Sequence, residues 1–84
     1  MKIVFFDPVS WDYCPITPFQ RPLGGTQSAV CYLSMALAQL GHQVYLINNI
    51  NNSEVINGIH CLNIRSGDEY IKEIINSSDI FIII

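Results

Sequence analysis

Charged side chains are scarce in this 84-residue chain, at 13% against the roughly 25% that is usual for soluble domains. The net charge is −3, and the basic residues are four and scattered: Lys2, Arg21, Arg65 and Lys72. A protein that binds nucleic acid needs a cluster of positive charge to meet the phosphate backbone. We therefore expect no nucleic-acid partner.

Long apolar runs and paired cysteines are also missing. The longest apolar run, Ile80–Ile84, is far below the roughly 20 residues that a membrane-spanning helix needs, and the N-terminus lacks the apolar stretch of a signal peptide. Cys14, Cys31 and Cys61 form no Cys-x-x-Cys pair and have no histidine at ligand spacing. These absences predict a cytoplasmic protein with free thiols and no metal site.

Apolar residues make up 50% of the chain and gather in short segments bounded by turn residues. The segments with strand character are Lys2–Phe6, Gln43–Ile47, Glu54–Ile56, Ile59–Ile64 and Ile80–Ile84. The short Glu54–Ile56 segment is expected to form a hairpin with its successor through the Asn57-Gly58 turn. At 84 residues the chain is one domain at most.

Two helices are expected between these strands. The first spans Thr26–Leu40, with an apolar face of Val30, Leu33, Leu37 and Leu40. The second begins at a capping box formed by Ser66 and Glu69, and its apolar face consists of Ile71, Ile74 and Ile75. Alternating strands and helices predict an α/β fold with a parallel sheet of three to four strands and flanking helices.

The most informative feature is the glycine pair Gly24-Gly25 at the start of the first helix. Adjacent glycines allow positive φ and close approach of a ligand, and the first N–H groups of a helix form an anion site. The loop before it, Asp7–Leu23, holds all four prolines and three aromatic residues in seventeen positions, which favours an ordered binding loop. A plain turn into the helix is the alternative for the glycines.

Two common nucleotide motifs are excluded. A dinucleotide fingerprint needs Gly-x-Gly-x-x-Gly in a tight turn and an acidic residue after the second strand, where this chain has Asn48-Asn49. A phosphate-binding P-loop needs Gly-Lys-Ser/Thr, which is absent.

Gly24-Gly25-Thr26-Gln27, the helix after it and Gly41-His42-Gln43-Val44 resemble the N-terminal domain of GT-B glycosyltransferases, particularly the retaining group called family 4 or group 1. The resemblance runs from Met1 to about Ile47, and more loosely to Asp79-Ile80. It implies that residues 1–84 are a truncated part of a Rossmann-like, acceptor-side domain, without the C-terminal donor-binding domain.

The resemblance also implies an activity: transfer of a sugar from a nucleotide-sugar to a sugar, lipid-linked or other small acceptor, with no cofactor besides this co-substrate and no metal. Gly24, Gly25 and Thr26 would approach the donor diphosphate. Candidates for the acceptor or cleft loop are Asp7, Trp11, Tyr13, Arg21 and Gln27. Gln27 stands where the family often has Glu.

The family's spaced donor-binding glutamates and basic residues lie outside this chain, so the 84 residues alone are expected to be inactive. Peripheral membrane association would come through the part that is not present. Two other functions stay open. One is a non-catalytic Rossmann-like module that binds a nucleotide or phosphorylated metabolite, and the other is a small interaction domain without a ligand.

Overall fold

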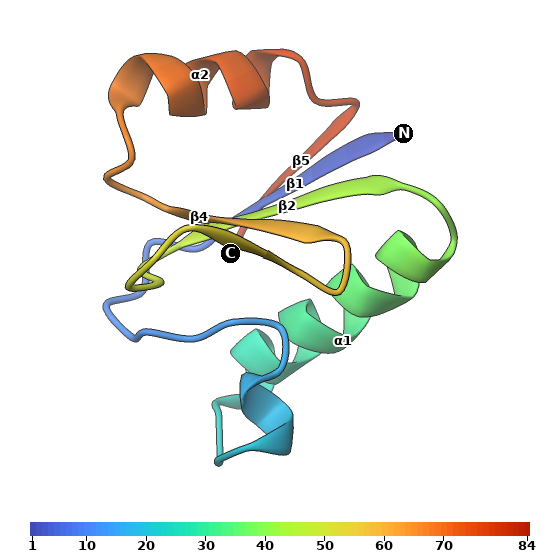
Figure 1. Cartoon of the computed structure of the whole chain (residues 1–84), viewed down its shortest axis with the longest axis vertical. Helices are drawn as coiled ribbons and strands as arrows, with labels where there is room; N and C mark the ends of the chain where they lie inside the picture. The colour runs from blue at the N-terminus through green and yellow to red at the C-terminus, as the bar shows by residue number, and fades with distance from the viewer.

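The computed structural model describes all residues, Met1–Ile84, as a five-stranded mixed sheet with one helix on each face (Figure 1). The strands, in the spatial order β3-β4-β2-β1-β5, are β1 (Lys2–Phe6), β2 (Gln43–Asn48), β3 (Glu54–Ile56), β4 (Ile59–Asn63) and β5 (Ile80–Ile83). The helices are α1 (Gly25–Gln39) and α2 (Asp68–Asn76), with a short 3-10 helix, η1 (Thr17–Phe19), in the loop after β1.

The strand predictions are confirmed, and the α/β class with them. Strands β1, β2, β4 and β5 are parallel to their neighbours, as expected, whereas β3 runs antiparallel to β4 at one edge. This hairpin makes the sheet mixed and brings it to five strands rather than three to four parallel ones. Asn57 and Gly58 both have positive φ, 50° and 80°, which is the geometry of a tight hairpin turn.

Helix α1 covers one face of the sheet, but its buried side differs from the predicted one. Val30 is buried and Leu37 is half-buried against the same core cluster, as expected, whereas Leu33 and Leu40 are 48% and 74% exposed. The buried positions also include two polar residues, Gln27 and Ser34. Spacing of apolar residues alone misplaced the face because Gln27 has a buried hydrogen-bond partner and Ser34 is small enough to lie close to the sheet.

Helix α2 covers the opposite face, where Ile71 and Ile74 are buried among the cluster that includes Val4 and Ile47, as predicted. The prediction of a capping box at the start of this helix is wrong. The N-cap residue is Gly67, at φ 131°, and no side chain caps the helix. The Ser66 hydroxyl instead donates to the carbonyl of Asn63 at 2.6 Å, because it lies one residue too early in the turn.

Strand β5 forms the second edge of the sheet and pairs only with β1. Its side chains are apolar, yet Phe81 and Ile83 are 38% and 67% exposed. None of the helices is both long and apolar enough to cross a membrane.

Candidate binding site at the carboxyl edge of the sheet

Polar residues follow the parallel strands at one edge of the sheet. Asp7 comes directly after β1, Asn48 ends β2 and Asn63 ends β4. Asn48 and Asn63 lie opposite each other in the register, and the Asp7 N–H donates to the carbonyl of Ile47 at 2.9 Å. Ligands of parallel α/β sheets bind outside this edge, so these positions mark where a site is expected.

The Asp7 carboxylate is buried and fully engaged by donors from this chain. Its Oδ2 accepts hydrogen bonds from the hydroxyl of Tyr13 at 2.6 Å and from Nε2 of Gln27 at 3.2 Å, and its Oδ1 accepts from the N–H of Val9 at 3.1 Å. Asp7, Tyr13 and Gln27 are only 2%, 1% and 8% exposed. These three predicted cleft residues therefore lie together, but they direct their polar atoms at one another.

Burial holds the Tyr13 hydroxyl in its neutral form. Desolvation raises its pKa well above the usual range, and the hydrogen bond to the Asp7 carboxylate raises it further. The backbone of Tyr13 is also fixed, because its carbonyl accepts a hydrogen bond of 2.8 Å from Nδ2 of the buried Asn48. The loop is thus tied to the ends of both β1 and β2.

A first pocket, of about 260 Å³, lies at the start of α1 and is lined by Trp11, Arg21, Pro22, Leu23 and Gly24. It brings together three of the predicted site residues. The Trp11 ring, half exposed, packs so closely that a Cβ on Gly24 would lie 3.3 Å from it and 2.9 Å from Oε1 of Gln27. A side chain at position 24 would therefore require the Gln27 amide or the Trp11 ring to shift.

The backbone at the glycine pair is not left-handed, which corrects one expectation. Gly24 is the N-cap at φ −56° and ψ 150°, and Gly25 is not among the residues with positive φ. The chain enters the helix in an extended conformation that any residue can adopt. A ligand can still approach the backbone closely at Gly25. Nothing lies within 4 Å of a Cβ built on Gly25, no side chain caps the helix, and Gly25 and Thr26 are exposed.

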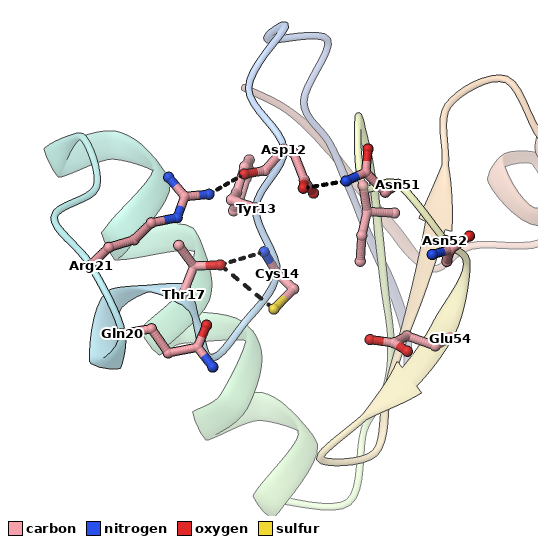
Figure 2. A pocket seen from close by; sticks show the side chains of 10 residues that line it. Asp12, Tyr13, Cys14, Thr17, Gln20, Arg21, Asn51, Asn52 and Glu54 are labelled. Carbon is pink, nitrogen blue, oxygen red and sulfur yellow. Dashed lines mark hydrogen bonds between the residues drawn. The ribbon is translucent and has the colours of Figure 1, made fainter.

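A second pocket, of about 310 Å³, lies between the Asp7–Leu23 loop and the segment that follows β2 (Figure 2). Nη2 of Arg21 donates to the carbonyl of Asp12 at 2.5 Å, and Nδ2 of Asn51 donates to Oδ2 of Asp12 at 2.8 Å. Arg21 lines both pockets.

Sequence reasoning missed most of the second pocket. Gln20, Asn52 and Glu54 line it, and none of them was a candidate. The signal available was the asparagine-rich run after the second strand, which lies at the ligand-binding edge of a parallel sheet.

The chain matches no protein-family model, no curated protein and no solved structure. The chemistry of this edge therefore has to be inferred from the residues that form it.

No three His, Cys, Asp or Glu side chains gather as metal ligands, and all three cysteines are free. Burial, and secondarily Cys14, raises the pKa of Cys31 and of Cys61 to about 12, so both thiols are neutral at pH 7. The two pockets offer hydrogen-bonding groups, the Arg21 guanidinium, the Asp12 and Glu54 carboxylates and the Trp11 ring.

Proposed function

We propose that this chain is the acceptor-side domain of a retaining nucleotide-sugar glycosyltransferase of the GT-B fold, family 4 or group 1, with a Rossmann-like sheet. The observation that carries the proposal is the position of Gly24-Gly25: the pair opens α1 at the carboxyl edge, beside the pocket that contains Trp11 and Arg21. In this function Gly24, Gly25 and Thr26 contact the donor diphosphate.

Strand order supports this position. From β1 the chain moves to β2 and then β4 on one side, and later returns to β5 on the other side. The direction of the connections therefore reverses next to β1, and such a switch point is where open α/β sheets bind ligands. The loop after β1 leads directly into α1 and its glycine pair.

Charge at the helix start also favours a diphosphate. A helix N-terminus carries a partial positive charge on its unpaired N–H groups, and the first turn of α1 contains no acidic residue to neutralise it. Arg21 lines the same pocket and adds a planar donor group of the kind that matches phosphate oxygens. The contribution of this chain is to bind and orient the substrates.

Donor binding can be tested on the 84-residue chain by nuclear magnetic resonance. Uniformly labelled protein is titrated with UDP-glucose, ADP-glucose and GDP-mannose, and we expect the amide signals of Gly25, Thr26 and Gln27 to shift. Gly25→Val should weaken binding at least about tenfold, equivalent to roughly 1.4 kcal/mol. Its free energy of unfolding should change little, because the space around a Cβ at this position is empty.

Ala29→Val is the matched control, since it adds a β-branched side chain to an exposed position one turn further along α1. Ala29→Val should bind like the wild type. No shift of the Gly25, Thr26 and Gln27 amide signals with any nucleotide-sugar would refute the contact between the glycine pair and the donor diphosphate. Equal affinity for UDP and UDP-glucose would favour the non-catalytic nucleotide-binding module.

The enzymatic part of the proposal is tested by reading the gene beyond the codon for Ile84. A second α/β domain with a spaced pair of glutamates and a basic residue is expected there. An in-frame stop codon directly after Ile84 would exclude a transferase made from this chain alone.

A further inference from the structure

The second pocket has the size of a small-molecule site. Its volume of about 310 Å³ is near the lower end of the range of roughly 300–1,000 Å³ for such sites. The loop after β1 forms one wall, and the segment from the end of β2 to the start of β3 forms the other, so Asp12 and Asn51, 39 positions apart, face each other (Figure 2). Seven of its ten lining residues are not hydrophobic, and an apolar ligand is therefore disfavoured.

Some polar groups of this pocket are fixed and others are free. The contact between Asp12 and Asn51 joins the two walls, and the contact between Arg21 and Asp12 lies within the loop wall. The side-chain amides of Gln20 and Asn52 and the carboxylate of Glu54 line the same space, and none of them makes a hydrogen bond within the chain. They are the groups available to a ligand.

The chemistry of these free groups selects hydroxyls. An amide offers both donors and an acceptor, and a carboxylate offers acceptors only, so together they match a hydroxyl group, which donates and accepts. Asp12 and Glu54 are acidic and Arg21 is the only basic residue in the lining, so one negative charge is in excess. Like charges at this range repel, which disfavours a phosphate or carboxylate ligand.

We propose that this pocket binds a neutral sugar ring as the acceptor, with Gln20, Asn52 and Glu54 contacting its hydroxyl groups. This inference rests on the proposed transferase function and adds the class of acceptor. Arg21 lines both pockets, so the hydroxyl-binding side adjoins the helix start, where phosphate is favoured.

The test is a titration of the labelled 84-residue chain with glucose, galactose, mannose and glucose 6-phosphate. At least one neutral sugar should shift the side-chain amide signals of Gln20 and Asn52, with a dissociation constant on the order of 1–10 mM for so small a ligand. Glucose 6-phosphate should bind at least about threefold more weakly, because of the excess negative charge.

Variants separate the role of shape from that of charge. Asn52→Ala and Glu54→Ala should each weaken sugar binding about fivefold or more, as expected when a hydrogen bond to the ligand is lost. Glu54→Gln keeps the shape of the side chain and removes its charge, so it should narrow the difference in affinity between glucose and glucose 6-phosphate. Both positions are exposed in the free protein, so folding is not at risk. Glu69→Ala, on the surface of α2, is the control and should bind like the wild type.

Two results would overturn the inference: no shift of the Gln20 and Asn52 signals with any neutral sugar, or equal or tighter binding of glucose 6-phosphate. Ligand-observed saturation transfer gives the same answer at low protein concentration if the chain associates. If neutral sugars fail to bind but UDP-glucose still shifts the Gly25 and Thr26 signals, the acceptor site is wrong and the donor contact is retained. The reverse pattern would overturn the proposed function but not the sugar site.

Discussion

The hydroxyl of Tyr13 donates a hydrogen bond of 2.6 Å to Oδ2 of Asp7, and both side chains are almost completely buried. This contact fastens the middle of the long loop to the end of β1. Trp11 and Asp12, on one side of Tyr13, line the two pockets, and Cys14, on the other side, lines the second. The geometry of the candidate site therefore depends on this buried pair.

Tyr13→Phe removes this hydrogen bond while keeping the ring. The Asp7 carboxylate would keep two donors but lose the closest one, so the free energy of unfolding should fall by about 1–3 kcal/mol. Urea denaturation followed by circular dichroism measures this change. Tyr70→Phe, on the exposed side of α2, should change stability by less than about 0.5 kcal/mol. Equal effects of the two variants would contradict the role given to the pair.

Alkaline pH should destabilise the fold through its buried thiols. The pKa of Cys31 and of Cys61 is raised from 9.0 to about 12 in the folded chain. A raised pKa means that the folded state favours the protonated thiol, so this stabilisation is complete below about pH 9 and is lost between pH 9 and 12. Denaturation at several pH values should show unfolding becoming easier across this window.

The Cys31→Ala variant tests whether the buried thiol contributes to the loss of stability at alkaline pH. The variant lacks one of the two thiols, so its free energy of unfolding should fall less steeply between pH 9 and 12 than that of the wild type. The comparison uses the slopes, because the smaller side chain also lowers stability at every pH by leaving a cavity. Identical slopes would show that the thiol does not control the alkaline transition.

The helices and strands of the fold were predictable from local patterns, whereas the buried side of α1 and the second pocket were not. All five strands and both helices lie where apolar runs and turn residues indicated. The buried side of α1 was missed because Gln27 is buried through its bond to Asp7, twenty positions away. The second pocket was missed for a similar reason: Gln20 and Asn52 become neighbours only when β1 and β2 pair.

The start of α2 gives a local test of backbone strain against side-chain capping. Gly67 has φ 131°, a conformation that residues with a Cβ rarely adopt, so Gly67→Ala should destabilise the chain by about 1–3 kcal/mol. Ser66→Ala should cost less than about 0.5 kcal/mol, because the exposed hydroxyl does not cap the helix. Thermal or urea denaturation of the two variants distinguishes them. A larger loss for Ser66→Ala would restore the capping box.

Strand β5 should make the 84-residue chain associate. An edge strand presents unpaired backbone groups, and the apolar side chains of Phe81 and Ile83 are exposed beside them. Ile83→Lys places a charge on this edge, and we expect it to weaken self-association at least about tenfold in sedimentation velocity at micromolar concentration. Val55→Lys is the control, since Val55 is equally exposed, at 62% against 67%, but lies on the short β3 at the opposite edge. It should associate like the wild type. A wild-type chain that stays monomeric at these concentrations, or equal effects of the two lysines, would show that β5 is not the associating edge.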